Sequence, residues 1–405
     1  MRFMLVDDSE PMLRLIATLL EGSGHTVACY VSPQQALLEA PSLQPDCILL
    51  DLMMPELDGF EVCRRLRLMP ELDRTRIVVI SGKSYEYDKR RVRQLGADGF
   101  IAKPVDARTF CAELEGILQE FAELTYWGTR GTLPVPGAGS LRYGGNTSCV
   151  TLQLPNEALL IFDAGSGIKL LSDHLLARQT QRLTAKIFIS HPHWDHINAL
   201  PFFVPLYQQG NEIEILGPGQ GDKSIRTILS GQMDDVYFPI TIREFGARVF
   251  FRDLREETVD FGNFQVDTLL LSHPGNCLGY RVRWQDRTYC YITDNELFPA
   301  GAPGHYPDYI SKLAEFVAGA DILTIDTTYL DEEYPRFVGW GHSSTRPVAE
   351  LAARAGVKHL HLFHHDPGQD DATIDAKLAE AQAHLQQLGA ITRCLCAAEG
   401  GVFKL

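Results

Sequence analysis

A six-residue run, His191-Pro192-His193-Trp194-Asp195-His196, brings three imidazoles and one carboxylate together in the sequence. It comes just after the apolar run Ile187-Phe188-Ile189, which predicts a buried strand. Gathering such groups at a strand end is costly unless a metal ion binds them. The run therefore predicts a metal site, and this site needs further ligands from the ends of other strands.

The composition bounds the class of protein. A chain of 405 residues predicts two or three domains, and 45% hydrophobic residues is enough for packed cores. The net charge of −15 argues against non-specific binding of long nucleic acid, because that requires clustered Lys and Arg. It does not exclude a small anionic substrate held by metals.

The same composition indicates the compartment. The nine cysteines are odd in number and scattered, which favours reduced thiols over a disulfide framework. The first residues lack the basic and then apolar pattern of a signal peptide, and no apolar run approaches the ~18 residues of a membrane span. We expect a cytoplasmic protein with no membrane association.

The first 120 residues or so alternate apolar strands with amphipathic helices. The expected strands are 3–6, 47–50, 77–80 and 99–102, and this alternation predicts a doubly wound parallel α/β sheet. Functional sites in such sheets lie at the carboxyl ends of the strands. The polar residues found there are Asp7, Asp8, Asp51, Ser81 and Lys103. Three converging carboxylates favour a hard divalent cation such as magnesium.

This part of the chain resembles the receiver domain of two-component response regulators, which has a flavodoxin-like fold. The matching motifs are Val6-Asp7-Asp8, Leu50-Asp51-Leu52-Met53-Met54-Pro55, Asp58-Gly59, Ser81-Gly82 and Lys103-Pro104. The resemblance implies phosphorylation of Asp51 by a sensor histidine kinase. It also implies the other roles: magnesium on Asp7, Asp8, Asp51 and the Met53 carbonyl, phosphoryl contacts from Ser81 and Lys103, and an aromatic switch at Phe100.

The boundary between the domains is short. Leu114, Ile117, Leu118 and Phe121 have helical spacing and predict a last helix from Asp106 to about Leu124. No Gly-, Ser- or Pro-rich linker follows. We therefore predict a receiver domain over 1–123 and a second domain over 124–405.

The second domain mixes strands and helices. Hairpins are expected over 149–162 and 279–292, a strand over 186–189, and helices over 168–176, 309–318, 347–355 and 371–388. Sheets with flanking helices, and polar residues on loops at strand ends, predict an αββα sandwich.

The sequence offers the further ligands that the six-residue run requires. His273, Asp294 and His364 each lie just past an apolar strand. His191 and His193, two residues apart, can share one ion, while Asp195 and His196 can turn toward a second. Nitrogen and oxygen ligands suit catalytic zinc, and paired metals can act together on a phosphoryl group.

Residues 125–405 resemble the metallo-β-lactamase superfamily through these same residues. The resemblance implies a first metal on His191, His193 and His273, a second on Asp195, His196 and His364, and Asp294 as the bridge between them. The metals would be zinc, manganese or iron. Gly341-His342-Ser343-Ser344 resembles the histidine motif of the branch that contains phosphodiesterases and tRNA 3′-processing nucleases. Asp195 and His342 are the predicted catalytic residues.

Several residues are expected to be structural. His365 neighbours His364 but is not the expected ligand, and Asp163 is expected to sit in a structural loop beside the metals. Trp194 and Tyr207 are candidates for the pocket entrance. Four other histidines of the second domain are expected in the core or on the surface: His174, His305, His359 and His361.

These observations predict a response regulator whose output domain is a binuclear metal-dependent hydrolase. The favoured reaction is hydrolysis of cyclic nucleotides or other small phosphodiesters, because the chain is acidic and shows no long basic arm over 200–250. One alternative is a thioester or lactone hydrolase on the same metals. Another is a ligand-sensing output module with little turnover. Phosphorylation of Asp51 is expected to control the pocket or the formation of a homodimer.

Overall fold

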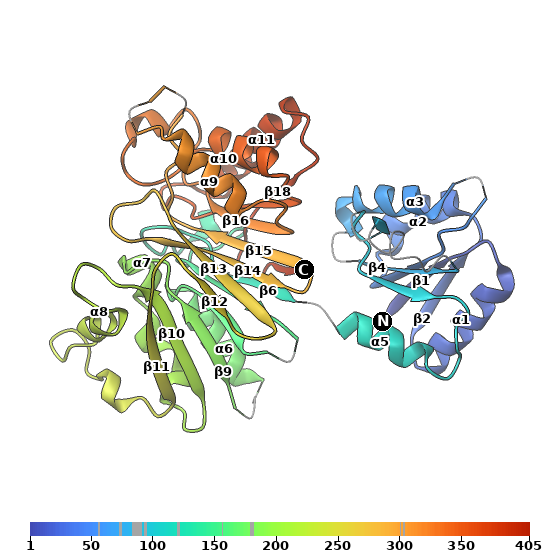
Figure 1. Cartoon of the computed structure of the whole chain (residues 1–405), viewed down its shortest axis with the longest axis horizontal. Helices are drawn as coiled ribbons and strands as arrows, with labels where there is room; N and C mark the ends of the chain where they lie inside the picture. The colour runs from blue at the N-terminus through green and yellow to red at the C-terminus, as the bar shows by residue number, and fades with distance from the viewer. Residues whose placement is uncertain are drawn as a thin grey trace. The chain divides into compact units, whose positions relative to one another are not determined.

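The computed structural model describes residues 1–55, 57–72, 75–82, 91–92, 95–119, 122–155, 157–178, 182–299, 301–302 and 304–405. The chain divides into two compact units, Met1–Phe121 and Ala122–Leu405 (Figure 1). Each unit has its own core, and each is described by itself.

The first unit is a five-stranded parallel sheet in the order β2-β1-β3-β4-β5. Its strands are β1 (Arg2–Val6), β2 (Thr26–Tyr30), β3 (Cys47–Leu50), β4 (Arg76–Ser81) and β5 (Gly99–Ala102). Helices α1 (Glu10–Gly22) and α5 (Phe110–Gln119) pack on one face, and α2 (Pro33–Leu43) and α3 (Gly59–Arg67) pack on the other. The doubly wound fold predicted from the alternation of strands and helices is confirmed.

The second unit contains two seven-stranded sheets. The first has the order β11-β10-β9-β8-β7-β6-β19 and the second the order β12-β13-β14-β15-β16-β17-β18. The strands of the first sheet are β6 (Glu123–Gly128), β7 (Cys149–Gln153), β8 (Leu159–Phe162), β9 (Thr184–Phe188), β10 (Glu212–Pro218), β11 (Arg248–Leu254) and β19 (Val402–Lys404). Those of the second are β12 (Thr258–Asp260), β13 (Phe264–Leu270), β14 (Leu278–Trp284), β15 (Arg287–Ile292), β16 (Ile322–Asp326), β17 (His359–Phe363) and β18 (Arg393–Cys396).

Helices cover the outer faces of both sheets. The first sheet is covered by α6 (Ile168–Ala177) and α8 (Ile225–Gln232), and the second by α9 (Pro307–Phe316), α10 (Thr345–Ala355) and α11 (Asp371–Gln387). The short α7 (Trp194–Ile197) follows β9. A separate apolar core fills the space between the sheets. These layers form the predicted αββα sandwich.

Buried tyrosines cross the core between the two sheets. Tyr280 of β14 donates a hydrogen bond to the carbonyl of Ile189 (2.6 Å), and Tyr291 of β15 donates to the Asp163 carboxylate (2.8 Å). In the opposite direction, the Tyr126 hydroxyl lies 2.6 Å from Thr324 Oγ1 and 2.7 Å from His361 Nδ1. Because each hydroxyl has a partner on the opposite side, these bonds fix the register of one sheet on the other.

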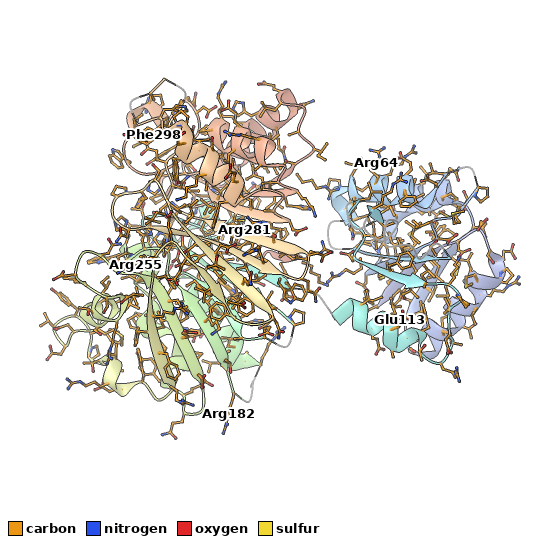
Figure 2. The ribbon with its side chains drawn as sticks, in the orientation of Figure 1. Arg64, Glu113, Arg182, Arg255, Arg281 and Phe298 are labelled. Carbon is orange, nitrogen blue, oxygen red and sulfur yellow. The ribbon has the colours of Figure 1, made fainter. Side chains whose placement is uncertain are left out.

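Side-chain contacts also attach the outer helices to the sheets. Arg281 of β14, labelled in Figure 2, donates to the carbonyl of Phe316, the last residue of α9, at 3.1 Å. A cation at this position also suits the negative end of the helix dipole. Within the described part of the chain, no helix has the length and apolar character needed to cross a membrane.

Two features differ from the sequence predictions. The last helix of the first unit does not extend to Leu124, because Glu123 and Leu124 belong to β6, where they pair with β7 and β19. Leu124 is fully buried between the sheets, so strand pairing outweighs helical spacing here. The edge strand β2 was not predicted; its apolar run is short, and only Tyr30 in it is buried.

Replacing Tyr126 with Phe removes a buried hydroxyl and leaves its partners unsatisfied. We expect the second unit to lose about 1–3 kcal/mol of unfolding free energy. Urea unfolding of the metal-free protein, followed by near-ultraviolet circular dichroism, measures this loss. Tyr237→Phe is the control, because Tyr237 is 79% exposed. Equal midpoints for the two variants would show that the inter-sheet hydrogen bonds contribute nothing.

Candidate metal centre

Strand ends deliver the polar groups of the site to one edge of the sandwich. The segment that contains His191 and His193 follows β9, and α7 then carries Asp195 and His196. His273 lies beyond β13, Asp294 beyond β15, and His364 directly beyond β17. Because β13, β15, β16 and β17 run in the same direction, their carboxyl ends share one edge of the second sheet.

The first group of candidate ligands contains His191, His193, His273 and Asp294, whose ligand atoms all lie within 4.8 Å of one another. His193 Nδ1 is 3.2 Å from His273 Nε2. Asp294 Oδ2 is 3.5 Å from His191 Nε2 and 3.7 Å from His273 Nε2. Three imidazole nitrogens and one carboxylate oxygen therefore surround a common point.

The second group contains Asp195, His196, His364 and again Asp294. Asp195 Oδ2 is 3.1 Å from His196 Nε2 and 3.2 Å from His364 Nε2. Asp294 Oδ1 lies 3.1 Å and 3.2 Å from the same two nitrogens. Asp294 therefore directs Oδ2 to the first group and Oδ1 to the second, as a bridging carboxylate does.

The chemistry of these atoms fits two divalent cations. The Nε2 atoms of His191 and His196 are buried and form no hydrogen bond, although carboxylate oxygens lie 3.1–3.5 Å away. Buried polar atoms without partners are rare in folded proteins. Nitrogen and carboxylate donors facing a shared centre are the ligands of zinc and similar metals.

A second layer of side chains orients the imidazoles through their other ring nitrogens. His196 Nδ1 lies 2.8 Å from Asp163 Oδ2, and His273 Nδ1 lies 3.0 Å from the carbonyl of Gly341. His191 Nδ1 is 3.1 Å from Ser190 Oγ, and His364 Nδ1 is 3.2 Å from Thr328 Oγ1. Such outer contacts fix the tautomer and orientation of metal-binding histidines.

Asp163 is the centre of this layer. Its fully buried carboxylate accepts hydrogen bonds from the Ser190 N–H (2.7 Å), the Ser190 hydroxyl (2.9 Å) and the Tyr291 hydroxyl (2.8 Å), in addition to its contact with His196. Burial alone would lower the pKa of His196, but Asp195, Asp294 and Asp163 raise that pKa well above its usual value. Asp163 therefore orients His196 of the second group through the ring nitrogen that does not face the other ligands.

His342 stands beside the second group. Its Nδ1 is 2.8 Å from Asp326 Oδ2, and its ring stacks on that of His364 with centroids 4.9 Å apart. Burial opposes the charged ring, but the carboxylates of Asp326, Asp294 and Asp195 raise the pKa of His342 to about 9. The His342 side chain keeps 13% of its surface exposed, whereas Asp326 is fully buried.

The backbone is unusual at three of these positions. Asp163, Asp294 and His364 have φ values of 60°, 44° and 60°, in the left-handed region that non-glycine residues seldom adopt. Such conformations collect at functional sites, where the surrounding structure holds them. Here they turn the side chains that follow β8, β15 and β17 toward the metal groups.

One side of the site is open. The side chains of His191, His196, Asp294 and His364 are almost completely buried, and that of His273 is only 3% exposed, whereas His193 is exposed. The site therefore faces solvent at His193.

The first unit holds a separate acidic group at the carboxyl ends of its strands. Asp7, Asp8 and Asp51 offer oxygens within 4.8 Å of one another, and Asp7 and Asp51 are buried. Lys103 Nζ contacts Asp7 Oδ2 at 2.8 Å and Asp51 Oδ1 at 3.1 Å. Burial raises the pKa of Asp51, and Lys103 opposes that rise.

Neighbouring residues shape this second pocket. The Met53 N–H donates to Asp51 Oδ2 at 3.1 Å, and Ser81 is buried at the end of β4. Gly59 is required for space, since a Cβ there would lie 2.2 Å from the Asp51 carbonyl oxygen. The half-buried Phe100 lies in β5, next to β4.

Comparison with known proteins identifies both units. Residues 3–115 match the family model of the response regulator receiver domain, and residues 160–365 match that of the beta-lactamase superfamily domain. This chain belongs to the beta-lactamase superfamily. A receiver domain is joined to its metallo-β-lactamase-fold domain.

Individual relatives cover different parts of the chain. The alkaline phosphatase synthesis transcriptional regulatory protein PhoP of Bacillus subtilis is 36% identical over 118 residues, which is 29% of this chain and 48% of PhoP. The chain thus spans about half the length of the curated response regulators that it matches first. Ribonuclease Z of Thermoplasma acidophilum is 24% identical over 303 residues, covering 65% of this chain and 92% of the relative.

The solved structures agree with the fold. The metallo-β-lactamase-fold protein YhfI from Bacillus subtilis superposes with a TM-score of 0.51 at 18% identity, over 70% of this chain and all of YhfI. The second domain is a hydrolase domain of this fold, which implies divalent metals, and the receiver domain implies a phosphodonor such as a histidine kinase.

The structure of this family member brings together all seven residues that were predicted as hydrolase ligands, and it includes His364 rather than His365. His365 instead lies buried with its Nε2 3.4 Å from the Ala397 carbonyl, and His361 bonds Tyr126. Tyr207 packs against Phe245 and donates to the Pro201 carbonyl.

The sequence prediction missed the outer layer. Asp163 was interpreted only as part of a loop, and Asp326 was not singled out. Asp326 ends the apolar strand β16, which is the same signal that located Asp294 and His364. Thr328 carries no such signal, because its role depends on a turn that brings its hydroxyl to the backbone and ring of His364.

Replacing Asp163 with Asn should weaken metal binding, because the amide cannot accept every hydrogen bond that the carboxylate accepts. We expect a 10- to 100-fold loss of affinity, about the usual cost of removing such a partner. Competition with a chromogenic chelator measures it. Asp173→Asn is the control, since among the described residues Asp173 pairs only with Lys169, on the surface of α6. Equal affinities for the two variants would contradict the positioning role.

Proposed function

We propose that this protein is a response regulator whose output domain is a binuclear metal-dependent phosphodiesterase for small phosphodiesters. The single observation that carries the proposal is the His342–Asp326 pair beside the second ligand group. Hydrolysis of a phosphodiester builds negative charge on the leaving oxygen, and a histidine held by a carboxylate can donate a hydrogen bond or a proton to it.

The candidate ligands divide between two metals. His191, His193 and His273 would hold the first, Asp195, His196 and His364 the second, and Asp294 would bridge them. When bound, two such metals supply positive charge to the non-bridging oxygens of the substrate and activate water for attack. Zinc, manganese and iron all accept this donor set.

The residues of the chain would then perform distinct tasks. Asp326 fixes the His342 ring through Nδ1, so Nε2 is the atom that remains to serve the substrate. Asp195 receives the Thr132 N–H at 2.7 Å in addition to its place in the second group, which ties the loop after β6 to the metals. Asp163 and Thr328 hold the rings of His196 and His364 from behind.

Two further observations support the substrate class. The relative from Thermoplasma acidophilum is called a ribonuclease, and ribonucleases cleave phosphodiester bonds. The net charge of −15 disfavours a long polyanion as substrate, because such binding depends on many cationic contacts. A small phosphodiester such as a cyclic nucleotide needs only the metals and a few nearby groups.

The activity test uses the full chain loaded with zinc or manganese. We expect hydrolysis of bis(p-nitrophenyl) phosphate, and a loss of about 10²- to 10⁴-fold in kcat for His342→Ala. His384→Ala is a matched control, because His384 forms a histidine–aspartate contact of the same 2.8 Å length with Asp331, outside the two ligand groups.

The outcomes separate the alternatives. No phosphodiester turnover with any divalent metal would overturn the proposal, and hydrolysis of a thioester or lactone that His342→Ala leaves unchanged would establish the first alternative. Tight ligand binding without turnover would instead support a sensing module.

We also propose that phosphorylation of Asp51 regulates this activity. Asp7, Asp8, Asp51 and the Met53 carbonyl would bind magnesium, and Lys103 and Ser81 would contact the phosphoryl oxygens. Lys103 already lies within 3.1 Å of Asp51 and is placed to neutralise added charge. Rearrangement around Ser81 and Phe100 would then carry the signal to the hydrolase domain or to a homodimer contact.

Incubation with a small acyl phosphate and magnesium should label the native chain and alter its turnover or oligomeric state. Asp51→Asn should abolish both the label and the change. Asp106→Asn is the control, because Asp106 is exposed and pairs only with Arg108 among the described residues. Phosphate-affinity electrophoresis, kinetics and light scattering provide the readouts. Labelling of Asp51→Asn at the native level would contradict the assignment.

A further inference from the structure

Two of the four tryptophans are exposed, and both adjoin the metal centre. Trp284 is buried in the core, and Trp127 is partly buried with its indole N–H on Thr151 Oγ1. By contrast, Trp194 is 82% exposed and Trp340 is 63% exposed. A large aromatic surface left in water is unfavourable, and it commonly marks a binding site.

Both residues are next in sequence to residues that contact or belong to the ligand groups. Trp194 stands between His193 and Asp195, one in each ligand group. Trp340 precedes Gly341, whose carbonyl accepts from His273 Nδ1 and whose Cα lies so close that a Cβ there would fall 2.2 Å from that nitrogen. Since His193 Nδ1 and His273 Nε2 are 3.2 Å apart, the segments that carry the two tryptophans come together at this pair of candidate ligands.

The backbone that carries Trp340 is held by a buried carboxylate. Glu296 is 2% exposed, and its two oxygens accept hydrogen bonds from the N–H groups of Gly339 (2.7 Å) and Gly341 (2.8 Å), on either side of Trp340. Both glycines have φ near +87°, which other residues seldom adopt. The Tyr334 hydroxyl also donates to Glu296 (2.8 Å). The buried Glu296 carboxylate therefore holds the backbone on both sides of Trp340, while the Trp340 side chain is exposed to solvent.

An aromatic column connects Trp340 with His342. Trp340 packs edge-on against Phe337 at 5.3 Å, and Phe337 stacks on Tyr329 at 4.5 Å with only 6° between the rings. Tyr329 then meets the His342 ring at 6.2 Å. Trp340 is therefore supported from the same side as the proposed catalytic histidine.

A third exposed apolar side chain follows a residue that contacts the second ligand group. Leu133 is 61% exposed and follows Thr132, whose N–H donates to Asp195. Leu133, Trp194 and Trp340 therefore lie on three separate segments of the chain. Each is exposed and is next in sequence to a residue that contacts or belongs to the ligand groups.

We propose that Trp194 and Trp340 form a stacking site for the base of a nucleoside phosphodiester. This inference rests on the proposed function, and it narrows the substrate class to small phosphodiesters that carry a nucleobase. A planar base covers indole surface that is otherwise in water, while its phosphodiester lies at the metals a few atoms away. Stacking accepts any base, so the site selects for the presence of a base more than for its identity.

The test compares two substrates in each variant. Trp194→Ala and Trp340→Ala should each lower kcat/KM for 2′,3′-cyclic AMP by about 10-fold or more, a typical cost of losing one stacking partner. Turnover of glycerophosphoethanolamine, which has no ring, should change less than about twofold on the same scale. The control is Ile391→Ala, because Ile391 is 95% exposed and precedes β18, at the amino ends of the parallel strands. Metal content is measured in every variant.

Equal losses for the two substrates, or no loss for either, would overturn the stacking site while leaving the phosphodiesterase proposal intact. If no phosphodiester is hydrolysed, the stacking site is tested by binding. AMP should quench the tryptophan fluorescence of the native chain but not of the Trp194→Phe/Trp340→Phe variant. Quenching by phosphatidylglycerol vesicles and not by AMP would overturn the inference in favour of a lipid surface.

Discussion

The hydrolase domain depends on burying ionisable side chains at one edge of its two sheets. Asp195, Asp294 and the imidazoles of His191, His196, His273 and His364 are buried together, and an unpaired ion in such a place costs several kcal/mol. Two sets of carboxylates offset this cost. Asp294 faces both histidine groups with separate oxygens, and Asp163 and Asp326 stand behind the rings. Tyrosines that cross the core then anchor this layer, since Tyr291 donates to Asp163 itself.

The same topological rule positions the chemistry of both domains. In the receiver domain, Asp7 and Asp51 follow adjacent parallel strands, and Lys103 follows a third strand of the sheet. In the hydrolase domain, His273, Asp294 and His364 follow strands that run in one direction. Strands supply the rigid apolar part of the fold, and the first three residues beyond them supply many of the polar groups. One chain thereby contains two candidate metal-binding edges built in the same way.

This rule also explains how far the sequence could be interpreted. Apolar runs followed by His or Asp located every residue of the two ligand groups, and the spacing of strands and helices predicted both folds. The rule fails where the role of a residue depends on its tertiary contacts with residues that are distant in the sequence. Asp163 and Asp326 both end apolar strands, but nothing local in the sequence shows that they accept from His196 and His342 rather than bind metal. It fails also at Leu124, where helical spacing continues into a residue that tertiary pairing places in β6.

The left-handed backbone at Asp163, Asp294 and His364 has a consequence for the choice of substitutions at this site. Asn adopts this conformation more readily than most residues, so Asn in place of either aspartate removes the charge with little added backbone strain. Ala at the same positions changes the charge, the side-chain volume and the backbone preference together. At His364 a β-branched replacement would add strain of order 1–3 kcal/mol to the loss of the ring. Mutational data from these three positions therefore report on ligand chemistry only when the replacement is matched to the backbone.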